Sequence, residues 1–164
     1  MGKMLNINEI LDFAIKIEQN GYAFYTRVAK KFNNLKIMKL IHYLAEEELR
    51  HESLFKALKK KKGIFTPHES YEGEYSIYTE EFLRSHFLST RESINKSIMI
   101  IKDEVDVIDF AIDFEKDSIV FFTTLKTFIT EDKEDVIERI IKEEVNHLKK
   151  LFVLRNEIKR EKKL

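Results

Sequence analysis

Apolar residues recur at steps of three and four along two stretches in the first part of the chain. The first stretch runs from Ile7 to Phe32 and the second from about Leu35 to Lys60. This spacing is the period of an amphipathic helix whose apolar side faces a core. Because only Asn33 and Asn34 separate the two stretches, we expect two long helices folded into an antiparallel hairpin over about residues 7–61.

The second part of the chain has the same organisation. One helical pattern starts at Asp103 and continues to Phe128, and another begins after Thr130-Glu131-Asp132. We expect these two helices to form a second hairpin over about residues 103–161. Two hairpins that bury their apolar stripes against each other predict an all-α, antiparallel four-helix bundle, a single domain over residues 1–164.

The segment between the hairpins, residues 62–102, is long enough to run from one end of the bundle to the other. It contains the only proline, Pro67, and one short helical pattern from Glu80 to Leu88. We therefore expect a long crossover connection that carries one short helix.

The composition excludes several classes of function. Lysine plus arginine and aspartate plus glutamate number 29 each, so no net charge favours nucleic acid or an anionic membrane as a partner. The sequence has no cysteine, which excludes disulfides, cysteine-ligated zinc and iron–sulfur clusters. Charges interrupt every apolar stretch before it reaches the length of a signal peptide core or a membrane span, so we expect a cytoplasmic protein.

The two hairpins also resemble each other in sequence. The first contains AIKIEQNGYAFY, from Ala14, and LAEEELRH, from Leu44. The second contains the matching segments AIDFEKDSIVFF, from Ala111, and IIKEEVNH, from Ile140. Each hairpin is therefore one copy of an internal repeat.

Each copy carries a lone glutamate on its first helix and a Glu-x-x-His pair on its second. These residues are Glu18, Glu48 and His51 in the first copy, and Glu115, Glu144 and His147 in the second. Since residues i and i+3 share a helix face, the members of each pair point to the same spot. The four helices then deliver four carboxylates and two imidazoles to one point in the bundle core.

Charges on solvated helix faces are the alternative explanation of this pattern. All four glutamates, however, have apolar residues four and seven positions before them and seven positions after them. Four unpaired carboxylates in a core would be costly, and no lysine or arginine recurs beside them on these stripes. We therefore predict two divalent cations about 3.5 to 4 Å apart, as in other two-metal centres. Carboxylate and imidazole donors without thiolate suit iron or manganese, with zinc as another occupant.

Three other polar residues lie near these stripes. Glu47 has a leucine seven residues away on each side and can support the site or belong to an interface. Glu143 stands between basic residues and is predicted to be solvated. Tyr25 lies two turns from Glu18, and either it packs in the core as its counterpart Phe122 does or it hydrogen-bonds a metal ligand.

The repeated segments resemble those of the rubrerythrin branch of the ferritin-like superfamily, over about residues 7–60 and 103–155. This resemblance implies that the six residues of the two copies are iron ligands and leaves open which glutamates bridge the ions. It also implies a diferrous centre that reacts with hydrogen peroxide or dioxygen, becomes diferric and is reduced again by an electron carrier.

Two features depart from the pattern of that family. Full rubrerythrins carry a rubredoxin domain with cysteine-ligated iron, so a chain without cysteine needs a separate electron-donor protein. They also resemble one another in an extra glutamate three residues after the lone glutamate of the second half, where this chain has Ser118. That carboxylate is associated with movement of an iron ion, and without it the ligand set resembles a symmetric ferroxidase centre.

Three functions follow as hypotheses. The first is a non-haem oxidoreductase that reduces peroxide or dioxygen, the second is a ferroxidase that handles iron, and the third is a bundle whose metal ions are structural or whose site is vestigial. We also expect a homodimer, because the bundle carries many aromatic residues and a long crossover can be exchanged between protomers.

Overall fold

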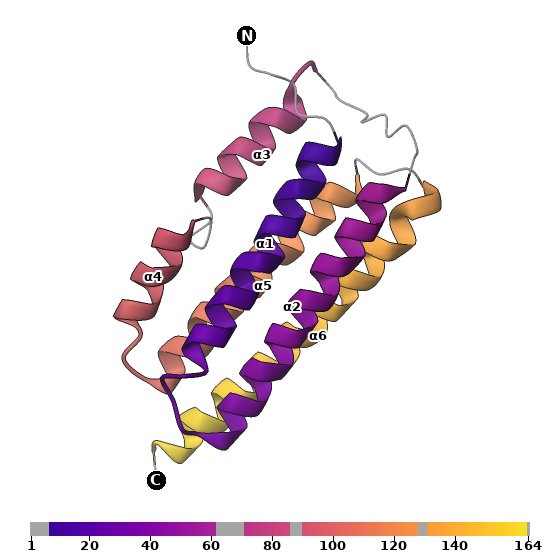
Figure 1. The fold of residues 1–164 in the computed structure, drawn as a ribbon. Helices are drawn as coiled ribbons and strands as arrows, with labels where there is room; N and C mark the ends of the chain where they lie inside the picture. Colours follow the sequence, from indigo (N-terminus) through magenta and orange to yellow (C-terminus); the bar gives the residue numbers. More distant parts are fainter. Residues whose placement is uncertain (1–6, 62–70, 86–89, 128–130, 164) are drawn as a thin grey trace.

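A computed structural model describes residues 7–61, 71–85, 90–127 and 131–163 of the chain. These residues form six helices and no strand: α1 (Ile7–Val28), α2 (Leu35–Lys60), α3 (Glu74–Ser85), α4 (Arg91–Ile100), α5 (Glu104–Lys126) and α6 (Glu131–Glu161). The four long helices run side by side, and the short helices α3 and α4 lie along one flank of them (Figure 1). The predicted all-α class is therefore confirmed.

The four long helices pack as two hairpins. Helix α1 packs along α2 and α5 packs along α6, and the hairpins meet where α1 contacts α5 and α2 contacts α6. Large aromatic side chains fill the space between them, and the most deeply buried include Phe24, Phe55, Phe114 and Phe122. Because burial of each such side chain removes a large apolar area from water, this core holds the hairpins together.

Side-chain caps fix where two of the long helices begin. The Asn34 side chain accepts hydrogen bonds from the backbone N–H groups of Lys36 and Ile37 at the start of α2. The Asp103 side chain accepts from Val105 and Asp106 at the start of α5, and the Asp106 side chain accepts from the backbone of Asp103 in return. Such caps satisfy N–H groups that have no partner within the helix.

Two predicted boundaries are corrected by the structure. Helix α1 ends at Val28 and not at Phe32, because the chain turns there to reach the cap of α2, and Phe32 packs against the core from this turn. The crossover carries two helices, α3 and α4, in place of one over residues 80–88, of which the last three lie outside the described residues.

The crossover helices pack against the bundle on which they lie. Helix α4 contacts α1, and in the turn that follows α1, Lys31 Nζ donates to the carbonyl oxygen of Ile98 at 2.7 Å. Helix α3 contacts α5, where the rings of Phe82 and Phe121 lie 4.9 Å apart. Among the described helices, none is both long and apolar enough to cross a membrane.

Candidate metal centre

Six ionisable side chains converge in the middle of the four-helix core. Helix α1 provides Glu18, α2 provides Glu48 and His51, α5 provides Glu115, and α6 provides Glu144 and His147. All six are at most 1% exposed. The apolar residues on the same helix faces are buried as well, so the packing of the stripes carries the carboxylates and imidazoles inward. The structure thus brings together all six residues that the sequence pattern selects.

These residues form two overlapping groups of potential ligand atoms. One group contains Glu18 and His51, the other contains Glu115 and His147, and both contain Glu48 and Glu144. Within each group the ligand atoms all lie within 4.8 Å of one another. Glu48 and Glu144 are therefore the two carboxylates that both groups share.

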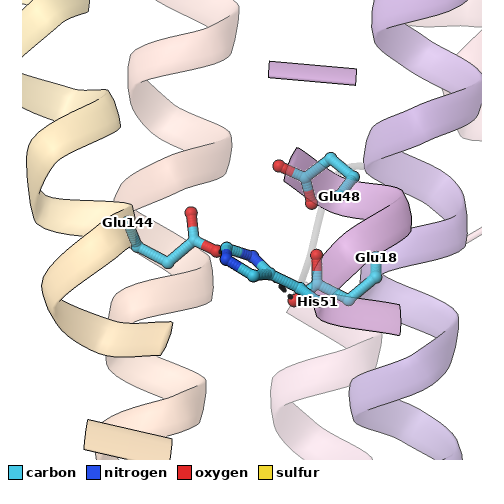
Figure 2. Close-up of side chains that lie close together, drawn as sticks. All are labelled: Glu18, Glu48, His51 and Glu144. Carbon is cyan, nitrogen blue, oxygen red and sulfur yellow. Dashed lines mark ion pairs between the residues drawn. The ribbon is translucent and has the colours of Figure 1, made fainter. Parts of the chain in front are cut away.

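The carboxylate of Glu144 reaches both imidazoles. Its Oε1 lies 2.7 Å from Nδ1 of His51, and its Oε2 lies 3.1 Å from Nδ1 of His147. Figure 2 shows Glu144 approaching His51 from α6, opposite Glu18 and Glu48. The two imidazole rings are stacked with their centroids 5.8 Å apart. Each ring therefore turns Nδ1 toward the carboxylates.

The outer nitrogen of His51 contacts Glu143, a residue that the sequence analysis predicted to be solvated. Its Nε2 lies 2.9 Å from Oε2 of Glu143, which also lies 2.7 Å from Nη2 of Arg50. The prediction that Glu143 is solvated is wrong, because its carboxylate turns toward the hairpin formed by α1 and α2 and is only 25% exposed. Glu47, for which a supporting role was one of the predicted alternatives, lies beside Arg50 and His147.

Tyr25 combines the two roles considered for it. Its ring is fully buried against Phe24 and Phe114. Its hydroxyl donates a 2.5 Å hydrogen bond to Oε1 of Glu115. Burial raises the pKa of the phenol well above its usual value, and the nearby carboxylate of Glu115 adds to this, so the tyrosine keeps its proton for the hydrogen bond.

Burial and mutual repulsion keep protons on most of the carboxyl groups when no cation is bound. Burial raises the pKa of Glu18 and Glu48 well above the usual value, and it raises the pKa of Glu115 to about 8, with the charge of Glu144 as the next cause. Glu144 behaves in the opposite way. Although burial alone would raise its pKa, hydrogen bonds from Glu115 and both imidazoles hold it well below the usual range.

The neighbouring carboxyl groups raise the pKa of both imidazoles. Burial alone would lower the pKa of His147, but its contacts with Glu115 and Glu144 outweigh this and raise it to about 11. The pKa of His51 is raised in the same way by Glu144 and Glu143. The cluster therefore attracts positive charge, which protons supply in the absence of metal ions.

The donor set fits two divalent cations. Several of its buried atoms have no hydrogen-bond partner in the described part of the chain, including Oε1 and Oε2 of Glu18, Oε1 of Glu48 and Oε2 of Glu115. Buried polar atoms normally have partners, and unsatisfied ones call for an explanation such as a bound ion or water. Oxygen and imidazole nitrogen donors without sulfur suit iron, manganese and zinc.

Ser118 takes the place of the further glutamate that the sequence resemblance implies. It stands one helical turn after Glu115, is 2% exposed, and its hydroxyl oxygen has no hydrogen-bond partner among the described residues. The matching position in the first half is Gly21, three residues after Glu18. Neither half therefore adds a further carboxylate at this level of the bundle.

Comparisons with known proteins agree with this geometry. The model of the protein family named Rubrerythrin matches residues 9–155. Among solved structures, the chain is similar to a candidate ferritin-like diiron-carboxylate protein from Thermotoga maritima, with 25% sequence identity and a TM-score of 0.65. That similarity covers 96% of this chain and 99% of the other. The comparison with curated proteins gave no match.

Proposed function

The chain belongs to the rubrerythrin family, and from this premise we propose that its buried centre binds two iron ions and reduces hydrogen peroxide or dioxygen. Glu18 and His51 would hold one ion, Glu115 and His147 the other, and Glu48 and Glu144 would bridge them. The observation that carries this proposal is the position of Glu144, whose two oxygens reach the imidazoles of both groups. Manganese and zinc are other ions that this donor set can hold.

When bound, two ferrous ions supply one electron each, and with two protons these electrons convert one hydrogen peroxide molecule to two water molecules. The chain contributes the environment for this chemistry. The six donors are held on four packed helices, so their positions are fixed before the ions bind. The hydroxyl of Tyr25 holds Oε1 of Glu115, so Oε2 would be the oxygen available to bind an ion.

The electrons that restore the ferrous state would come from a separate donor protein. Rubredoxin-type iron needs cysteine ligands, and this sequence has none. A homodimer also stays a prediction, because the structure contains one chain.

A test of the proposal compares the iron-loaded protein with free ferrous iron. The protein would be loaded anaerobically with two ferrous ions per chain and mixed with one equivalent of peroxide while the absorbance of the iron is followed. We expect rapid stoichiometric oxidation, and loss of both iron atoms in the variants Glu48→Ala and Glu144→Ala. Glu46→Ala, a change at an exposed neighbour on α2, is the matched control. Oxidation no faster than that of free ferrous iron would reject the oxidoreductase.

Ferroxidase activity is the second candidate, and Ser118 is the observation that favours it. Without a further carboxylate, each ion would have a histidine and a lone glutamate of its own and would share Glu48 and Glu144 with the other ion. Such equal donor sets suit a centre that oxidises ferrous ions and releases them. Uptake of many iron ions per chain in air would support this function, whereas saturation at two ions would reject storage. Ions that bind but never change oxidation state would indicate a structural role.

A further inference from the structure

A second set of contacts surrounds the imidazoles on the side away from the carboxylate centre. Each imidazole turns Nε2 toward a glutamate of the opposite hairpin. Nε2 of His51 lies 2.9 Å from Oε2 of Glu143, and Nε2 of His147 lies 3.6 Å from Oε2 of Glu47. These two glutamates directly precede Glu144 and Glu48 in the sequence, so the internal repeat places both.

Arg50 joins the two glutamates. Its guanidinium donates to both oxygens of Glu47, at 3.2 and 2.6 Å, and Nη2 lies 2.7 Å from Oε2 of Glu143. One side chain of α2 thus connects a glutamate of its own helix with a glutamate of α6. We call Glu47, Arg50 and Glu143 the outer bracket.

The outer bracket is not a third metal site. Glu47, His51 and Glu143 lie close enough together to hold an ion. The guanidinium of Arg50, however, already lies within 2.7 Å of both carboxylates and supplies the positive charge that an ion would bring. A cation added there would be repelled by Arg50 and would have to displace it.

The outer bracket contacts the histidines of the two halves of the centre at different distances. Arg50 precedes His51 in the first copy, but the matching residue before His147 is Asn146, which is exposed. His51 therefore has a hydrogen bond of normal length to Glu143, whereas the distance from His147 to Glu47 is too long for one. The rings of Tyr43 and His147 lie in a T-shaped contact.

We propose that the outer bracket makes the two metal subsites unequal, so that the subsite of His51 binds its ion more tightly than the subsite of His147. A hydrogen bond from Nε2 to a carboxylate fixes the tautomer of an imidazole, leaves Nδ1 free to ligate, and raises its basicity. His51 has this hydrogen bond, and His147 lacks it. Glu47, Arg50 and Glu143 are positioning residues, and the inference rests on the dimetal centre proposed above.

Stepwise titration of the metal-free protein with cobalt(II) tests the inference, with visible absorbance and bound metal measured together. We expect two steps in the unmodified chain. Glu18→Gln should remove the tighter step and Glu115→Gln the weaker one, because each glutamate belongs to only one group. If no cobalt binds, or if neither variant changes a step, the dimetal centre itself is rejected.

The bracket is tested by isosteric changes within the same titration. Glu143→Gln should weaken the tighter step by about 10- to 100-fold, the range found when a partner of a ligating histidine is removed. Glu46→Gln, which removes an exposed charge from α2, should change neither step. If Glu143 had a purely structural role, Glu143→Gln would lower the melting temperature without weakening one cobalt-binding step more than the other.

Two results would overturn the bracket while leaving the centre intact. One is equal affinity for both ions in the unmodified chain. The other is an equal effect of Glu143→Gln on both steps, or no effect on either, with helical content unchanged by circular dichroism.

Discussion

The hydroxyl of Tyr25 lies 2.5 Å from Oε1 of Glu115, although the two residues are 90 positions apart in the sequence and lie on different hairpins. Both side chains are fully buried. The hydrogen bond therefore ties α1 to α5 at the level of the metal centre. It also breaks the symmetry of the repeat, because the counterpart of Tyr25 in the second half is Phe122, which has no hydroxyl.

Removal of this hydroxyl should destabilise the fold without disturbing its packing. Tyr25→Phe keeps the ring but leaves Oε1 of Glu115 buried without its donor, so we expect the free energy of unfolding to fall by about 1 to 3 kcal/mol. Urea unfolding of the metal-free protein measures this change. Tyr22→Phe, at a position that is 37% exposed, is the control and should have little effect. Equal stability of Tyr25→Phe and the unmodified chain would show that the hydrogen bond contributes nothing to the fold.

Replacement of Glu48, a carboxylate that both groups of potential ligand atoms share, should weaken metal binding without lowering the stability of the metal-free fold. Glu48 is buried, and its Oε1 has no hydrogen-bond partner among the described residues, so Glu48→Gln removes a group that is costly to bury. We expect the metal-free variant to be at least as stable as the unmodified chain.

The same variant should lose the stabilisation that metal ions provide. At an ion concentration about 100 times Kd, each bound ion should add about 2.7 kcal/mol to the free energy of unfolding of the unmodified chain, because the ions bind only the folded state. Thermal unfolding with and without metal measures this gain, and Glu46→Gln should retain it. A metal-free Glu48→Gln that is less stable than the unmodified chain would mean that the carboxyl group supports the fold on its own.

Local patterns in the sequence were sufficient to predict the long helices and to select the six converging residues. Each glutamate interrupts an apolar stripe on its own helix, and the internal repeat shows the same arrangement twice. The start of α2 at Leu35 could be predicted because Asn34 is a strong cap located beside the apolar pattern. These signals lie within about two helical turns of the residues that they describe.

The contacts that sequence reasoning missed join residues far apart in the chain. Glu143 is flanked by basic residues and looks solvated, but its partner Arg50 lies on the other hairpin. The crossover was difficult for a different reason. Helices α3 and α4 each bury one narrow face on a long helix, and this leaves a weaker periodic signal than a core helix does. A glutamate repeated before each Glu-x-x-His motif was the one available indication of the outer bracket.

The metal-free protein should lose stability as the pH rises from about 5 to 8. The pKa of Glu115 is about 8 in the folded chain and about 4.3 in an unfolded one, so between these values the folded state holds a proton that the unfolded state has lost. The protonated Glu115 therefore contributes its full stabilisation below its pKa in the unfolded chain. This contribution is lost as the pH rises through its pKa in the folded chain. The raised pKa values of Glu18 and Glu48 act in the same direction, as does that of His147, about 11, above the usual histidine range.

Urea unfolding in the presence of a chelator, at pH 5.5, 7 and 8.5, measures this dependence. Glu115→Gln should make this dependence shallower, because the amide does not titrate while Glu18, Glu48 and His147 still do. The lowered pKa of Glu144 acts only in more acidic solution and lies outside this range. A free energy of unfolding that increases from pH 5.5 to 8.5 would contradict the protonated state of the carboxyl cluster.

The close approach of α1 to the centre depends on Gly21. A Cβ atom there would lie 2.7 Å from two ring atoms of Phe114 and 2.9 Å from Oε2 of Glu48, which is closer than van der Waals contact allows. Alanine favours a helix over glycine by about 1 kcal/mol, but crowding in a packed core costs about 1 to 3 kcal/mol. We expect Gly21→Ala to destabilise the metal-free protein and to weaken metal binding, because either Phe114 or Glu48 must move.

The matching change in the second half provides the control. Ser118→Ala removes a buried hydroxyl that has no hydrogen-bond partner among the described residues and adds no atom, so its stability should equal or exceed that of the unmodified chain. Urea unfolding and metal titration of both variants compare the two halves directly. If Gly21→Ala were as stable as Ser118→Ala and bound metal equally well, α1 would have room to move away from the centre, and the glycine would not be needed for the approach of Glu18.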